Sequence, residues 1–112
     1  MNSLRDALRQ FAAERDWDQF HSPKNLAIAL SVEASELLEH FQWLTEDQAK
    51  ALPPEKRDQV RDEMADVLLY LVRLADKLEV DLLDAAAKKI AKNAKKYPAD
   101  QVRGSMKKYT DY

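Results

Sequence analysis

Residues 54–79, PEKRDQVRDEMADVLLYLVRLADKLE, decide the fold. No Gly or Pro follows Pro54 in this stretch, so it can run as a helix for about seven turns. Seven of its apolar residues fall within one arc of that helix, which is typical of a helix that buries one face; they are Val60, Met64, Val67, Leu68, Leu71, Leu74 and Leu78. The stretch therefore predicts one long amphipathic helix.

A second long helix is predicted over residues 22–43, because Ser22 is a favourable N-cap and Pro23 suits the first helical position. This helix carries an apolar arc of the same kind. Ile28 and Val32 add a second apolar strip on another side. A helix that is apolar on two sides is buried on two sides, so we expect the chain to assemble as a dimer or tetramer.

Shorter elements fill the rest of the chain. We expect a first helix from a capping box at Ser3 and Asp6 to about Trp17, a short turn opened by a capping box at Thr45 and Gln48, and a last helix from its cap at Asp81 to Lys96 or Tyr97. Residues 99–112 are expected to form a loop-like tail. The prediction is an all-α fold, a helical bundle of two long and two shorter helices in one domain over residues 1–112.

The composition supports this prediction and narrows the chemistry. A single Gly in 112 residues argues against strands joined by tight turns. The absence of cysteine excludes a disulfide framework, a thiolate zinc site and a Cys nucleophile. We find no apolar signal core and no apolar run long enough to span a bilayer, so we expect a cytoplasmic protein without a membrane partner.

The net charge of −2 conceals an uneven distribution of charge. Residues 1–84 carry 10 basic and 18 acidic side chains, a balance of −8, whereas residues 85–112 carry 8 basic and 2 acidic ones, a balance of +6. The lysines between Lys88 and Lys96 could bind phosphate oxygens or form a solvated helix face. A nucleic-acid partner is not expected, because the whole chain is acidic and its aromatics are not interleaved with the lysines.

Four carboxylates stand out on the two long helices. Glu33 and Glu36 on one, and Glu63 and Asp66 on the other, are each three residues apart and lie at matching positions beside the apolar arcs. Packing the helices together would gather four negative charges, which a divalent cation can neutralise. Oxygen ligands favour Mg²⁺, with Mn²⁺ as an alternative. The plain alternative is a set of surface acids that pair with arginines.

The chain resembles the all-α, MazG-like nucleoside triphosphate pyrophosphohydrolases, and within them the dCTP pyrophosphatase branch. The two acid pairs, separated by 26 residues, follow the signature of that family. Further matching segments are Phe11–His21, Phe41–Trp43, Asp66–Val72, Asn93–Pro98 and Lys108–Thr110. One departure is Leu8, which stands where the dCTP branch can carry a substrate-contacting His.

The resemblance implies a reaction and a set of roles. A (deoxy)nucleoside triphosphate, with dCTP or a modified dCTP as first candidate, would be cleaved to the monophosphate and pyrophosphate, removing unwanted nucleotides from the pool. Mg²⁺ would bind Glu33, Glu36, Glu63 and Asp66, with Glu33 or Glu36 as general base. The substrate would contact Trp17, His21, Trp43, Tyr70, Asn93, Lys96 and Tyr97. A different hypothesis is a non-catalytic helical interaction module that docks through its apolar faces.

Overall fold

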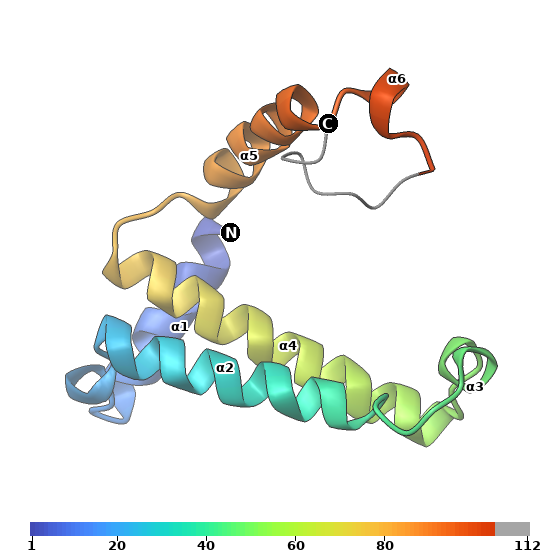
Figure 1. Cartoon of the computed structure of the whole chain (residues 1–112). Coiled ribbons are helices and arrows are strands. Elements are labelled where there is room, and N and C mark those ends of the chain that lie inside the picture. The colour runs from blue at the N-terminus through green and yellow to red at the C-terminus, as the bar shows by residue number, and fades with distance from the viewer. Residues whose placement is uncertain (105–112) are drawn as a thin grey trace. The chain divides into compact units, whose positions relative to one another are not determined.

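The computed structural model describes residues 1–104, and within that range it contains helices and no strand (Figure 1). The expected all-α fold is therefore confirmed. The chain divides into two compact units, Met1–Val80 and Asp81–Tyr112, and a single domain over residues 1–112 stays a prediction. The first unit contains α1 (Asn2–Glu14), the 3₁₀ turn η1 (Asp18–Phe20), α2 (Pro23–Glu39), α3 (Glu46–Lys50) and α4 (Pro54–Lys77); the second contains α5 (Leu82–Lys96) and α6 (Ala99–Val102).

Helices α2 and α4 form the centre of the first unit. They run side by side in opposite directions, and α1 packs against α4 (Figure 1). The buried apolar residues come from these three helices, and they are Ala12, Leu26, Val60, Val72 and Ala75. Ala12 and Leu26 are each 1% exposed, and the other three are 4% to 8% exposed. This antiparallel helix pair therefore carries the small core of the first unit.

The starts of the middle helices follow the sequence signals. The hydroxyl of Ser22 accepts a hydrogen bond of 3.1 Å from the Asn25 N–H, and Pro23 opens α2. At α3 the Thr45 hydroxyl and the Gln48 side chain bond each other's backbone N–H groups, which is a complete capping box. These two predicted helix starts are confirmed, and so is the predicted cap at Asp81, which accepts a hydrogen bond from the Asp84 N–H.

Helix α1 differs from the expectation at both ends. The capping box at Ser3 is wrong, because the Arg5 N–H already donates to the Met1 carbonyl at 2.9 Å and places Ser3 inside the first turn. The helix ends at Glu14 rather than near Trp17. Asp16 has a φ of 54°, in the left-handed region that a right-handed helix cannot contain, so the chain turns here into η1.

The other differences are at C-terminal ends. Helix α2 ends at Glu39, and residues 40–43 continue as turns instead of regular helix. The tail was expected to be a loop, but Ala99–Val102 form the short helix α6, with Asp100 in the first turn where an acidic side chain is favourable. Residues 105–112, including the Lys108–Thr110 motif, lie outside the described residues.

Among the described helices, none combines the length and apolarity that crossing a membrane requires.

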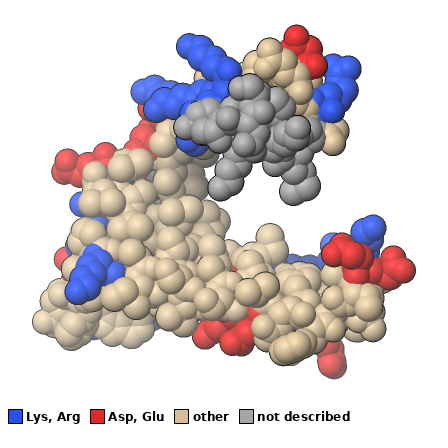
Figure 2. Space-filling view, in the orientation of Figure 1, with Lys and Arg blue, Asp and Glu red and all other residues tan. Residues whose placement is uncertain are grey.

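Several large apolar side chains remain at the surface of the first unit. Ile28 and Val32, which form the predicted second strip of α2, are 53% and 50% exposed. On α4, Met64 and Leu68 are also exposed. Uncharged residues cover most of the visible face formed by α2 and α4 (Figure 2). The first unit thus exposes many large apolar side chains to solvent, although it buries only a few.

Candidate active site

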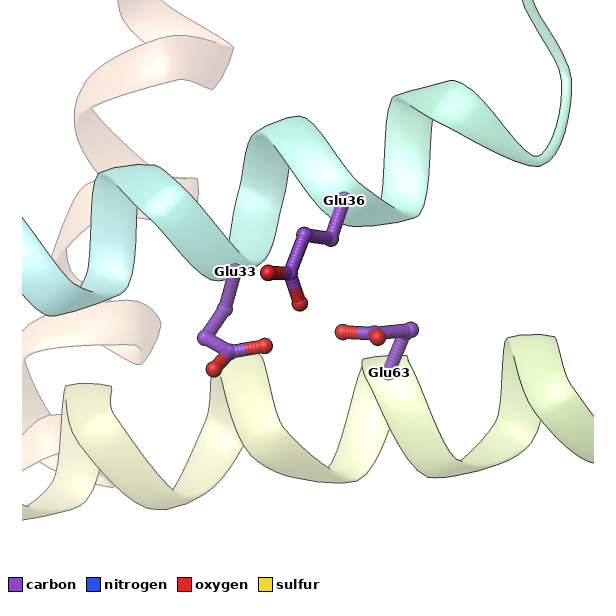
Figure 3. A group of neighbouring side chains, drawn as sticks. All are labelled: Glu33, Glu36 and Glu63. Carbon is purple, nitrogen blue, oxygen red and sulfur yellow. The ribbon is translucent and has the colours of Figure 1, made fainter.

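Three carboxylates meet between α2 and α4. Glu33 and Glu36 extend from successive turns of α2 toward α4, and Glu63 extends from α4 toward α2 (Figure 3). One oxygen of each side chain lies within 4.8 Å of the corresponding oxygens of the other two. The antiparallel packing of the two helices therefore brings together acids that are up to 30 residues apart in the sequence.

The surroundings of these carboxylates disfavour three negative charges. All three side chains are half-buried, and one oxygen of Glu33 and one of Glu63 are buried without a hydrogen-bond partner among the described residues. Burial, together with hydrogen bonding to Glu63 and Glu36 and repulsion by their charges, raises the pKa of Glu33 to about 7. A cation placed among the three would satisfy the unpaired oxygens and remove the repulsion, so these residues fit a hard divalent ion.

Asp66, the fourth expected ligand, is not part of the three-carboxylate group. It lies on α4 one turn beyond Glu63 and lines a neighbouring cavity of about 220 Å³. This cavity is lined by Leu8, Phe11, Ala12, Trp17, His21, Asp66, Leu69, Tyr70 and Arg73. Three of the expected substrate-binding residues, Trp17, His21 and Tyr70, thus share one cavity with an expected metal ligand.

Aromatic side chains shape one wall of this cavity. The Phe11 and Trp17 rings meet edge to face with their centroids 5.8 Å apart. The guanidinium of Arg15 lies 3.6 Å from the centroid of the Phe11 ring. A wall of this kind suits a flat, polarisable ligand such as a nucleobase.

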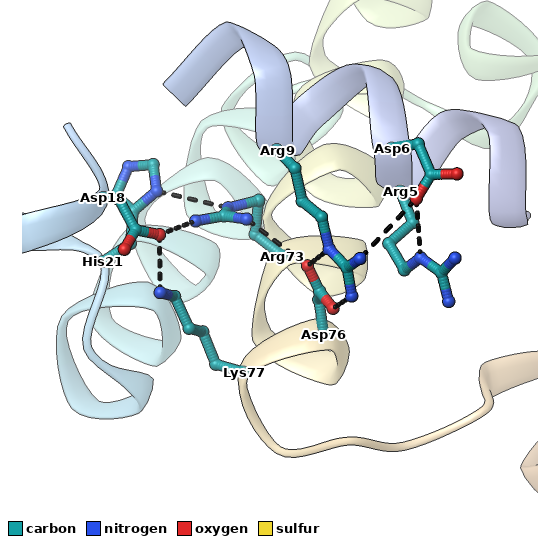
Figure 4. A network of polar contacts seen from close by, with 8 residues as sticks. All are labelled: Arg5, Asp6, Arg9, Asp18, His21, Arg73, Asp76 and Lys77. Atoms are coloured by element: carbon teal, nitrogen blue, oxygen red, sulfur yellow. Dashed lines mark hydrogen bonds and ion pairs between the residues drawn. The ribbon is translucent and has the colours of Figure 1, made fainter. Parts of the chain in front are cut away.

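A network of charged groups adjoins the cavity (Figure 4). At its centre, Arg73 is 5% exposed and donates to His21, Asp18 and Asp76. Asp18 also accepts a hydrogen bond from Lys77, and Asp76 also accepts from Arg9. Hydrogen bonds from Lys77 and Arg73 lower the pKa of Asp18, and the bond from Arg9 lowers that of Asp76. The network ties α1 and η1 to α4.

One expected substrate-binding residue of the first unit lies away from the cavity, and three others belong to the second unit. Trp43 follows α2, is 87% exposed and does not line the cavity. Asn93 and Lys96 lie on α5, and Tyr97 is the residue that ends it. These three belong to the second unit, so their role at the site stays a prediction.

Four residues that line the cavity, Phe11, Ala12, Leu69 and Arg73, were not predicted from the sequence as site residues. Phe11 was named only as the first residue of a segment that matches the family, and Arg73 was not named. The signal for Arg73 was its spacing, because positions 66, 70 and 73 lie on one face of a helix. The place of Phe11 in the cavity wall follows from the packing of α1 against α4.

The fold and the site define a class of all-α proteins in which two antiparallel helices share a carboxylate group beside an aromatic-lined cavity. The model of the MazG-like family matches residues 28–112, and the chain belongs to the MazG-like family. Mouse dCTP pyrophosphatase 1 is 47% identical over 113 residues, which cover 99% of this chain and 66% of the mouse protein. For human dCTP pyrophosphatase 1 the identity is 43%, with the same coverage.

A solved structure supports the fold independently. The crystal structure of a pyrophosphatase from Archaeoglobus fulgidus DSM 4304 is 42% identical to this chain with a TM-score of 0.83, covering 88% of this chain and 92% of the archaeal one. The chain spans 66% of the length of the mouse relative, slightly less than two thirds.

Proposed function

We propose that the chain hydrolyses a (deoxy)nucleoside triphosphate, with dCTP or a modified dCTP as first candidate, to the monophosphate and pyrophosphate. The observation that carries this proposal is the carboxylate group of α2 and α4 next to a cavity with an aromatic wall. Membership of the MazG-like family and the similarity to dCTP pyrophosphatase 1 support it. The reaction would remove unwanted nucleotides from the cytoplasmic pool, without a nucleic-acid partner.

The metal in this proposal is Mg²⁺, with Mn²⁺ as an alternative. Glu33, Glu36 and Glu63 would hold it, and Asp66 would approach from the next turn of α4. When bound, the ion would neutralise charge on the phosphate oxygens of the substrate. The unpaired buried oxygens of Glu33 and Glu63 support this assignment.

The general base in the proposal is a glutamate of α2. Hydrolysis adds the oxygen of a water molecule to the α-phosphorus and breaks the bond to the oxygen that bridges the α and β phosphates. The proton of that water passes to Glu33 or Glu36.

The nucleoside would occupy the cavity, with the base against Trp17 and with Tyr70 and His21 supplying polar contacts. We extend the proposal to Asn93, Lys96 and Tyr97 as ligands of the phosphate tail, on the family resemblance. The exposed apolar strip of α2 supports self-association as a dimer or tetramer.

The direct test is a panel of nucleotides incubated with purified protein and Mg²⁺, with the products separated by chromatography. We expect pyrophosphate and dCMP from dCTP, and loss of activity in Glu63→Gln. Glu39→Gln, an exposed glutamate on α2, is the matched control. Release of orthophosphate alone, or full activity in Glu63→Gln, would overturn the proposal.

The exposed apolar strip of α2 also supports a second candidate function, that of a non-catalytic helical interaction module. Thermal melting separates the two candidates. Bound Mg²⁺ and dCTP should raise the melting temperature of an enzyme of this type and leave that of a pure interaction module unchanged.

A further inference from the structure

Arg73 lies at the centre of the charged network and belongs to none of the roles proposed above. It is the one charged residue that is fully buried among the described residues, with 5% of its surface exposed. A buried guanidinium is costly unless its donors are satisfied. Here Nη2 donates to Asp18 at 2.8 Å, Nη1 to Asp76 at 3.4 Å and Nε to His21 at 3.3 Å.

The contact with His21 determines the form of the imidazole. Arginine carries only donors and stays protonated, so the Nδ1 atom that receives its N–H must be a bare acceptor. The single proton of the neutral ring is then on Nε2. Burial and the positive charge of Arg73 also lower the pKa of His21, which keeps the ring neutral.

The contact with Asp18 determines the position of the turn that carries the cavity wall. Asp18 opens η1, and Trp17 and His21 flank this turn. Asp18 receives hydrogen bonds from Arg73 and Lys77, both on α4. From the other side, the Asn25 side chain of α2 donates to the Phe20 carbonyl at 3.1 Å. The short turn is therefore held at both ends, and Arg73 is the buried part of that attachment.

We propose that Arg73 is a positioning residue for the nucleobase. It fixes the His21 ring in the Nε2–H form and ties η1 to α4, so that the cavity presents a rigid aromatic wall with a hydrogen-bond donor beside it. The Nε2–H of His21 would donate a hydrogen bond to an acceptor atom of the base, such as a carbonyl oxygen or a ring nitrogen. The inference rests on the proposed function, since it assumes that the cavity takes the base.

The first test measures the tautomer of His21 by nitrogen-15 NMR on the nucleotide-free full chain. The chain has two histidines, so His40 serves as an internal reference. We expect the Nε2–H pattern for His21 in the wild type and its loss in Arg73→Met. Arg61→Met is the matched control, because Arg61 is an exposed residue of α4 that also pairs with an aspartate three residues away. An Nδ1–H pattern in the wild type would overturn the inference.

The second test separates binding from chemistry. We expect Arg73→Met to raise KM for the nucleotide about tenfold, as for the loss of one well-placed hydrogen bond, with kcat within about twofold of the wild type. Asp18→Asn weakens only the exposed end of the attachment and should raise KM less, which covers the case in which Arg73→Met does not fold. Equal KM values in both variants and the wild type would overturn the inference.

The two tests also distinguish failure of this inference from failure of the proposed function. If no nucleotide is hydrolysed, the proposed function fails and the assignment of a base to the cavity fails with it, whereas the NMR pattern still shows whether Arg73 sets the ring. If hydrolysis occurs and the His21 pattern is insensitive to Arg73, only the positioning role is overturned.

Discussion

Glu33 connects the charge of the site to the stability of the fold. Its pKa is raised from 4.5 to about 7, so between these values the folded chain binds a proton that the unfolded chain has released. The stability contributed by this group is therefore present at low pH and is lost as the pH rises toward 7. The folded protein thus carries an unfavourable carboxylate at neutral pH unless a cation balances it.

We accordingly expect the melting temperature of the metal-free protein, prepared with a chelator, to fall as the pH rises from 5 to about 7.5. This fall should be steeper in the wild type than in Glu33→Gln. His21 acts in the opposite direction, because its lowered pKa makes the fold lose stability as the pH falls through the ordinary value of 6.5. Because His21 is present in both the wild type and Glu33→Gln, the difference between their slopes measures the contribution of Glu33 alone. Saturating Mg²⁺ should flatten the wild-type slope, and equal slopes without metal would contradict the prediction.

A second prediction concerns Glu63, whose buried oxygen has no hydrogen-bond partner among the described residues. Replacing it by Gln removes a charge from the group and a ligand from the metal. We expect activity to fall at least about 100-fold, in line with the several kcal/mol that metal catalysis supplies. The chelated variant should melt no lower than the wild type, because the repulsion has been relieved. A loss of both activity and stability would instead indicate a structural role.

The metal residues show how far sequence patterns reach at this scale. Spacing predicted that Glu33, Glu36 and Glu63 would meet, and they do. Asp66 has the same helical phase on α4 as Glu36 has on α2, but it does not join the carboxylate group. Helical phase does not determine how far two packed helices are shifted along each other. The charge of Arg73 could be read from the sequence, but its burial could not, because burial depends on which residues pack over it.

At the scale of helices, capping signals predicted starts where the chain before the helix is extended. Ser22 and Thr45 both have extended backbone and accept the expected bonds. Ser3 has the same side chain chemistry, but the helix around it begins earlier, at Asn2. The helical pattern itself was reliable, because α4 has a continuous apolar face, whereas the ends depend on single hydrogen bonds.

The cap at Ser22 should matter for stability. We expect Ser22→Ala to lower the free energy of unfolding by about 1 kcal/mol, the usual value of a lost N-cap. Ser31→Ala is the matched control, since the Ser31 hydroxyl donates to the Ala27 carbonyl within α2 and Ala is the better helix former. Denaturant titration with circular dichroism measures both. An equal loss in the two variants would show that the cap contributes nothing special.

At the scale of the whole molecule, the small core and the exposed apolar residues belong together. A unit with few buried side chains gains stability by covering more surface, and the apolar strip of α2 is available for that purpose. The sequence indicated this from the two-sided apolar pattern of α2. It could not indicate the cavity, whose walls come from α1, η1 and α4, because no local pattern records which distant residues will share a space.

We expect the protein to sediment as a species larger than the 12.9 kDa of one chain. The double variant Ile28→Glu, Val32→Glu places charges in the exposed strip of α2 and should shift the distribution toward the monomer. Gln59→Glu adds a negative charge at an exposed polar position of α4 and serves as the control. A wild-type protein that remains a monomer at high concentration would contradict this prediction.

The two tryptophans also equip the protein with separate optical reporters. Trp17 stands edge-on to Phe11 in the cavity and is 46% exposed, whereas Trp43 is 87% exposed outside it. In a Trp43→Phe variant the remaining indole emission should shift and resist iodide quenching when a nucleotide fills the cavity. In a Trp17→Phe variant the remaining emission comes from Trp43, and it should shift when self-association covers that side chain. Occupancy and assembly can thus be followed separately, each in its own single-tryptophan variant and without an attached dye.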